Sequence, residues 1–149
     1  MRLSRVLAAA TLTLAGAVMA QPDTAALERQ VSDAEKAFAR SMAERRFDDF
    51  ARHVSDQAVF YGGSQVHRGK AAVLAAWKGF FEGEKAPFSW GPDRVDVLAD
   101  GQLAFSSGLV RDPQGKVFSR FNSVWRLEPG GTWRVVFDKG SPLTEAERK

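Results

Sequence analysis

Residues 86–140 read APFSWGPDRVDVLADGQLAFSSGLVRDPQGKVFSRFNSVWRLEPGGTWRVVFDKG. Apolar and polar residues alternate through most of this stretch, and turns that contain glycine or proline interrupt it, which is the pattern of consecutive β-strands. The stretch predicts three or four strands of one antiparallel sheet. With the helical segments that precede it, it favours a single α+β domain with a concave face.

Neighbouring side chains of a strand point to opposite faces of the sheet. In the strand predicted for residues 103–111, one face is small and the other is bulky, with Leu103, Phe105, Ser107, Leu109 and Arg111. In the strand predicted for residues 117–128, one face is mainly apolar, with Val117, Ser119, Phe121, Ser123, Trp125 and Leu127. Which face of each strand lines the concave side stays open at this point.

Two turns separate these strands. Residues 112–116 contain Pro113 and Gly115, and residues 129–131 read Pro-Gly-Gly. Proline presets φ for a turn, and glycine tolerates a positive φ. A last strand with Trp133, Val135 and Phe137 on one face then completes a meander.

The first 20 residues read as a secretory signal. Arg2 and Arg5 precede an apolar run from Val6 to Met19, which is shorter than the roughly 20 residues of an ordinary membrane span. Cleavage is expected after Ala20, with Ala17 as the alternative, and an uncleaved membrane anchor is the competing interpretation. We therefore expect a signal peptide at 1–20, a domain at 21–149, and a periplasmic or secreted location.

Charge and cysteine content exclude several classes of protein. The net charge is +3, but without Arg2 and Arg5 the chain has 19 basic against 18 acidic residues, and no run of Lys or Arg marks a nucleic-acid or membrane surface. There is no cysteine, which excludes disulfides, thiolate chemistry and a lipid-anchored lipoprotein. We expect neither nucleic acid nor, after signal cleavage, a membrane as a partner.

Three helical segments precede the sheet. Asp23 can cap a helix whose apolar positions recur at Leu27, Val31, Ala34, Phe38 and Met42. A shorter helix with Phe47, Phe50 and Val54 follows, then a short hairpin formed by residues 58–61 and 65–67. A third helix is predicted for residues 70–82, with Gly83 as its C-cap.

Several motifs together resemble a known superfamily. They are Phe47-Asp48 after a long first helix, Asp56-x-Ala58-Val59-Phe60, Gly69-Lys70-Ala71-Ala72-Val73, Val124-Trp125-Arg126 and Gly131-x-Trp133-Arg134-Val135-Val136. The chain resembles the nuclear transport factor 2-like superfamily, and within it the SnoaL-like and ketosteroid-isomerase-like branch of small exported bacterial proteins. The resemblance implies a cone-shaped domain in which a bent sheet wraps around the helices, with a pocket at its wide end. It leaves function open, because this fold hosts isomerases, dehydratases, cyclases and binding modules.

Three residues are candidates for chemistry in such a pocket. A ketosteroid-type isomerase needs a carboxylate base and a hydrogen-bond donor for the enolate oxygen. Tyr61, the only tyrosine, is the candidate donor, with packing at the edge of the core as the alternative. Asp138 is the candidate carboxylate, but alternation with Val135 and Phe137 favours an ion pair at the sheet surface. His67, at the end of the short hairpin, is either a proton shuttle at the pocket mouth or a solvated turn residue.

The chain has more aromatic residues than a small core readily buries, which favours an aromatic-lined cleft for a flat apolar ligand. Arginine suits the recognition of a ligand carboxylate or carbonyl. Arg111 is equally consistent with a ligand contact and with a cross-strand pair, whereas Arg120 is expected on the outer face. The candidate ligand-binding residues are Trp77, Phe81, Trp90, Phe105, Arg111, Phe121 and Trp125.

No cofactor is implied by the sequence. His53 and His67 form no metal-binding pattern, and the Gly62–Lys70 segment lacks the spacing and the Ser or Thr of a phosphate loop. Three functions remain: a domain that binds a small apolar molecule, which we favour; an isomerase or lyase that abstracts a proton; and a structural module. Because relatives commonly dimerise through the outer sheet face, a homodimer is expected.

Overall fold

The computed structural model describes residues 22–148, so the predicted signal peptide lies outside the described residues. The N-terminal half supplies the helices α1 (Thr24–Ala43), α2 (Phe47–His53) and α3 (Lys70–Trp77), and a 3₁₀ turn, η1 (Lys78–Phe81), extends α3. A second 3₁₀ turn, η2 (Ala146–Arg148), lies near the C-terminus. The three predicted helical segments are present, but the predicted C-cap Gly83 is wrong, because Lys78 caps α3 and Glu82 caps η1.

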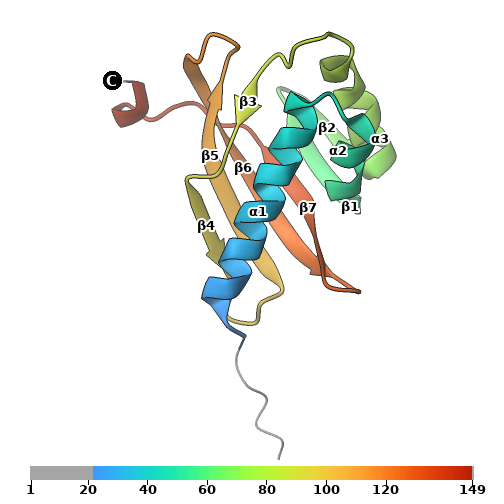
Figure 1. The fold of residues 1–149 in the computed structure, drawn as a ribbon, viewed down its shortest axis with the longest axis vertical. Helices are drawn as coiled ribbons and strands as arrows, with labels where there is room; N and C mark the ends of the chain where they lie inside the picture. Colours follow the sequence, from blue (N-terminus) through green and yellow to red (C-terminus); the bar gives the residue numbers. More distant parts are fainter. Residues whose placement is uncertain (1–21, 149) are drawn as a thin grey trace, which may run out of the picture.

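One sheet contains every strand in the described part of the chain: β1 (Val54–Gly62), β2 (Gln65–Arg68), β3 (Ser89–Trp90), β4 (Arg94–Val97), β5 (Leu103–Arg111), β6 (Val117–Glu128) and β7 (Thr132–Lys139). The strand order is β2-β1-β7-β6-β5-β3, and β4 pairs with a different part of β5. The β1–β7 pair is parallel and the others are antiparallel, so the sheet is mixed. The predicted single α+β domain, with a bent sheet wrapped around helices, is confirmed (Figure 1).

Helix α1 runs diagonally across the concave face of the sheet (Figure 1). As predicted, Asp23 caps it, because Oδ1 of Asp23 accepts a hydrogen bond from the Ala26 amide at 3.1 Å. Its buried face brings Phe38 against Phe50, with ring centroids 4.6 Å apart, and against Trp125 at 5.9 Å. Burying one such side chain contributes about 1.5–3 kcal/mol, so these contacts anchor the helix to the sheet.

The register of β5 and β6 decides which residues face α1. Ala104 pairs with Trp125, and Gly108 pairs with Phe121. The small face of β5 and the apolar face of β6 therefore line the concave side, and bulky residues of β5 such as Phe105 point outward. The small side chains leave room for the helix and for the cavity described below.

A β-bulge in β7 reverses the alternation of that strand. Trp125 pairs with Val135, but Val124 pairs with Phe137, so Val136 is an extra residue on β7. One extra residue exchanges the faces of all residues beyond it. Consequently Phe137 points outward and is 47% exposed, while Asp138 points to the concave side, beside Ser123.

Within residues 22–148, no helix has both the length and the apolar content that a membrane crossing requires.

Candidate functional site

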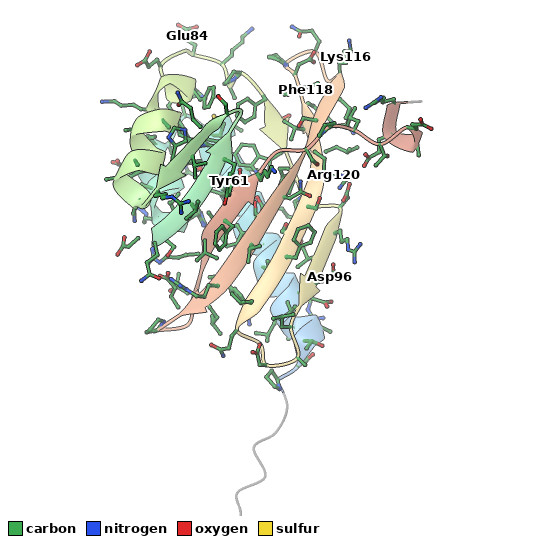
Figure 2. The ribbon with its side chains drawn as sticks, turned by 180° about the vertical axis from the view of Figure 1, so that it is seen from behind. Tyr61, Glu84, Asp96, Lys116, Phe118 and Arg120 are labelled. Atoms are coloured by element: carbon green, nitrogen blue, oxygen red, sulfur yellow. The ribbon has the colours of Figure 1, made fainter. Side chains whose placement is uncertain are left out.

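A cavity of about 520 Å³ lies at one end of the concave face. Helix α3, η1 and the segment that leads into β3 form one side, and the ends of β1, β2, β6 and β7 form the other. Figure 2 shows Tyr61, Phe118 and Arg120 at this end of the sheet, whereas Asp96 on β4 lies toward the opposite end. We call this space the aromatic cavity, because eight of its lining residues are aromatic: Phe38, Tyr61, Trp77, Phe80, Phe88, Trp90, Phe118 and Phe121.

The rings of the aromatic cavity touch one another in a connected network. Trp77 meets Phe80, Phe88 and Trp90 edge-to-face, with centroid separations of 5.5, 6.0 and 6.3 Å. Trp90 in turn meets Phe38 at 5.6 Å. Edge-to-face packing is the favoured geometry of aromatic pairs, so the wall is an ordered surface that suits a flat apolar molecule.

Asp138 brings a carboxylate into this apolar wall. Its Oδ2 accepts a hydrogen bond from the Ser123 hydroxyl at 2.8 Å, and its Oδ1 has no hydrogen-bond partner within residues 22–148. Burial raises the pKa of Asp138 to about 6, although the Ser123 hydrogen bond acts in the opposite direction. The predicted surface ion pair of Asp138 is therefore wrong, because the β7 bulge turns the side chain inward.

Glu35 is a second carboxylate behind this wall, and it was not among the residues predicted from the sequence. It is fully buried on α1, where Oε1 accepts from the Trp90 indole and Oε2 from the Trp125 indole, both at 2.8 Å. Burial raises the pKa of Glu35 to about 7, the two indole hydrogen bonds lower it, and the negative charge of Asp138 raises it further. Glu35 thus fixes the orientation of Trp90 in the cavity wall.

The sequence did contain a signal for Glu35. Val31, Glu35, Phe38 and Met42 follow at spacings of four, three and four residues, so Glu35 occupies the apolar stripe of α1. The predicted stripe contained Ala34 in place of Glu35. A carboxylate among core positions indicates a paired or functional group, because an isolated buried charge is very costly.

Tyr61 and His67 both line the aromatic cavity, on the β1–β2 hairpin. Tyr61 is 37% exposed and lies at the rim, and Nζ of Lys139 sits 5.8 Å from the centroid of its ring. His67 pairs in register with Phe60, and its ring packs over Gly62. The three predicted catalytic residues, Tyr61, His67 and Asp138, therefore border one space.

The predicted ligand-binding residues divide into two groups. Trp77, Trp90 and Phe121 line the aromatic cavity. The other four lie elsewhere: Trp125 is enclosed in the core, Phe81 packs on Phe47 and Phe50, Phe105 points outward, and Arg111 donates to the Gly115 carbonyl at 3.2 Å. These four residues were predicted to line the cavity. The prediction failed because the sequence did not show which face of each strand turns inward or which aromatic residues the core encloses.

Arg120 borders the cavity, but its guanidinium is already paired. It donates to both carboxylate oxygens of Asp93, at 2.8 and 2.9 Å, and through Nε to Glu147 at 2.7 Å. It also reaches the Ser107 hydroxyl on the outer face of β5 at 3.1 Å. These contacts connect the C-terminal turn η2 to the sheet. They also pair the positive charge of Arg120 with carboxylates of the protein itself.

The histidines show no metal-binding arrangement. His53 packs between Phe38 and Trp125, with centroid distances of 5.6 and 6.2 Å, and burial lowers its pKa. In the described range 22–148, no group of three or more His, Cys, Asp or Glu side chains is placed to hold a metal ion.

Several solved structures share the fold of this chain at low sequence identity. An NTF2-like protein of unknown function from Pseudomonas putida KT2440 is 21% identical, with a TM-score of 0.66, and the match covers 85% of this chain and 94% of that one. A ketosteroid isomerase-like protein from Erwinia carotovora atroseptica SCRI1043 is 15% identical, with a TM-score of 0.60 and coverages of 78% and 96%. A domain of unknown function with a cystatin-like fold from Nostoc punctiforme PCC 73102 is 18% identical, with a TM-score of 0.66 and coverages of 84% and 82%.

The family follows from a direct sequence match. The model of the SnoaL-like domain matches residues 34–136, which is more than half of the chain. The protein belongs to the SnoaL-like domain family, as the sequence motifs predicted. No curated protein matches the chain.

Proposed function

We propose that the domain binds a small apolar molecule in the aromatic cavity. The observation that carries this proposal is a space of about 520 Å³ with a connected aromatic wall and one carboxylate that has a free oxygen. Pockets for small molecules combine mostly apolar linings with a few placed polar groups, and their volumes fall in this range. The aromatic wall supplies affinity in this account, and Asp138 orients the ligand.

Two aromatic residues of similar exposure, one inside the cavity and one outside it, allow binding in the cavity to be distinguished from binding elsewhere on the surface. Phe80 lines the cavity and is 42% exposed, whereas Phe105 lies on the outer face and is 37% exposed. Naphthylmethanol is a suitable probe, because it joins a flat ring system to one hydroxyl, and its binding can be followed by calorimetry. Phe80→Ala should weaken binding roughly five- to tenfold, since an aromatic pair contributes about 1 kcal/mol.

Phe105→Ala is the matched control and should leave the affinity for naphthylmethanol unchanged. Equal effects of the two substitutions, or the absence of saturable binding to the unmodified protein, would contradict a ligand site in the aromatic cavity.

A second candidate function, an isomerase or lyase that abstracts a proton, is supported by the environment of Asp138. A general base works best when its pKa lies near the working pH, and burial raises the pKa of Asp138 to about 6. In this proposal Asp138 takes a proton from the carbon next to a carbonyl. The Tyr61 phenol donates a hydrogen bond to the resulting enolate oxygen, and His67 returns a proton.

Deuterium exchange tests this second function without knowledge of the natural substrate. β-Tetralone is a flat apolar ketone, and NMR in D₂O follows the loss of its α-protons. The protein should accelerate the exchange, Asp138→Asn should abolish the acceleration, and Tyr61→Phe should reduce it. If tetralone binds but exchanges no faster than in buffer alone, the isomerase or lyase function is contradicted and the binding function stands.

We also propose that the protein is exported, because its first 20 residues resemble a secretory signal. Arg2, Arg5 and the apolar run up to Met19 have the pattern of a signal that is removed after Ala20. Mass spectrometry of the protein recovered from its host should then find Gln21 at the N-terminus. Recovery of a chain that still begins with Met1 would favour a membrane anchor.

A further inference from the structure

Around the aromatic cavity, the described carboxylate lacks a cationic partner, whereas the described guanidinium has carboxylate partners. Among the lining residues, which the structure describes in full, Asp138 has no cationic partner, and the guanidinium of Arg120 is matched by Asp93 and Glu147. Behind the wall lies Glu35, which has two indole donors and also no cationic partner within residues 22–148. Two carboxylates without a counter-ion thus share one apolar region.

The other titratable and charged groups nearby do not neutralise this region. His67 faces the cavity from β2, and His53 lies in the core with its pKa lowered by burial. The ammonium of Lys139 lies over the Tyr61 ring at the rim, and no ion pair joins it to a described carboxylate. The described lining of the cavity therefore holds a half-buried carboxylate without a cationic partner, and its negative charge attracts a cation.

The aromatic wall complements a cation as well as a flat ring. The face of an indole or a benzene ring carries partial negative charge and attracts an ammonium within about 6 Å of its centroid. Trp90 is held in place by its hydrogen bond to Glu35, and Trp77 and Phe88 contact it at 6.3 and 5.9 Å. Several rings around one carboxylate are the arrangement that binds organic ammonium groups.

We propose that the ligand of the aromatic cavity is an apolar organic amine, whose ammonium group pairs with the free Oδ1 of Asp138 while its ring system stacks on Trp77 and Trp90. This inference rests on the proposed small-molecule site and specifies its ligand class. The ammonium supplies the missing counter-ion, so the pKa of Asp138 should fall when the amine binds. A neutral ligand of the same shape lacks this interaction, and an anionic one is repelled.

Three probes with one ring system and different charge test the proposal. Naphthylmethylamine, naphthylmethanol and naphthoate are titrated by calorimetry at low ionic strength, at a pH where Asp138 is ionised and the amine is protonated. The amine should bind at least about tenfold more tightly than the alcohol, because its hydrogen bond to Asp138 joins two opposite charges. Naphthoate should bind most weakly.

Two isosteric substitutions complete the experiment. Asp138→Asn should bring the amine and the alcohol to within about twofold of each other, whereas Asp96→Asn, which removes an exposed carboxylate on β4, should preserve the preference. Near-UV circular dichroism checks that both variants fold. If the alcohol binds as tightly as the amine to the unmodified protein, the ligand class is wrong although the small-molecule site stands; if none of the three binds, both proposals fail.

Discussion

At the scale of single residues, Glu35 is the most unusual feature of the protein. A carboxylate in the core is tolerated only when its oxygens are satisfied, and the Trp90 and Trp125 indoles do this at 2.8 Å each. The same pair of bonds connects the core to the cavity wall, since Trp125 is enclosed and Trp90 lines the cavity. Glu35 is thus a positioning residue for the candidate site.

Substitution of Glu35 by glutamine should change how stability depends on pH. Burial raises the pKa of Glu35 to about 7, above its ordinary value of 4.5, so the folded protein holds this proton more strongly than the unfolded chain. The free energy of unfolding therefore falls as pH rises from about 4.5 to about 7. Glu35→Gln cannot ionise, and its stability relative to the unmodified protein should rise by up to about 3 kcal/mol over this range.

Urea unfolding of both proteins at pH 5 and pH 8 measures this difference. Glutamine offers only one acceptor oxygen to two indoles, so the free energy of unfolding of the variant is lower by about 1–3 kcal/mol at every pH. This constant loss does not affect the comparison between the two pH values. The negative charge of Asp138 is one cause of the raised pKa of Glu35, so the repulsion between the two carboxylates contributes to the measured difference with the same sign. Glu44→Gln, at an exposed carboxylate, is the control; a stability difference for Glu35→Gln that stays constant with pH would contradict the assigned role.

At the scale of elements, β5 and β7 determine the shape of the site. The sequence predicted the meander, its turns and the apolar face of β6, because period-two alternation is a strong local signal. It could not reveal the bulge in β7, since Val135 and Val136 are both apolar and either could pair with β6. It also could not show that the small face of β5 turns inward, because that depends on how α1 packs. Asp138 and Phe105 were consequently assigned to the wrong faces.

A glycine on β5 sets the position of β3 and of Trp90. A Cβ atom built on Gly108 would lie 1.9 Å from the Gly91 carbonyl oxygen and 2.8 Å from Phe121, so the backbone would have to move. Gly108→Ala should lower the free energy of unfolding by about 2 kcal/mol or more. Gly79→Ala, where a Cβ meets open space, should have little effect. Thermal unfolding of the two variants makes the test, and equal melting temperatures would show that this close approach is not required.

At the scale of the whole molecule, the outer face of the sheet carries an apolar row. The row consists of Phe137, Val124 and Phe105, which pair in register across β7, β6 and β5. Phe137 on β7 is 47% exposed and Phe105 on β5 is 37% exposed, and only β6 separates the two strands, so large apolar side chains are exposed close together. We propose that a second copy of the chain covers this row, which leaves the aromatic cavity on the concave side accessible.

Sedimentation of the mature protein tests the proposed homodimer. The unmodified protein should sediment as a dimer at micromolar concentration, and Phe137→Glu should convert it to a monomer, because a charge in an apolar contact is costly. Leu98→Glu, at a residue that is 55% exposed but outside the row, should leave the dimer intact. A monomeric unmodified protein would refute the proposed interface.

Binding of a small apolar molecule in the aromatic cavity can be measured directly through the four tryptophans. Each indole N–H gives its own NMR signal, and Trp77 and Trp90 line the cavity, whereas the indole of Trp133 bonds to Gln30 on another part of the surface. On addition of naphthylmethylamine, the signals of Trp77 and Trp90 should shift until saturation while that of Trp133 stays in place. Unchanged signals for Trp77 and Trp90, or a shift of Trp133 as large as theirs, would contradict the account.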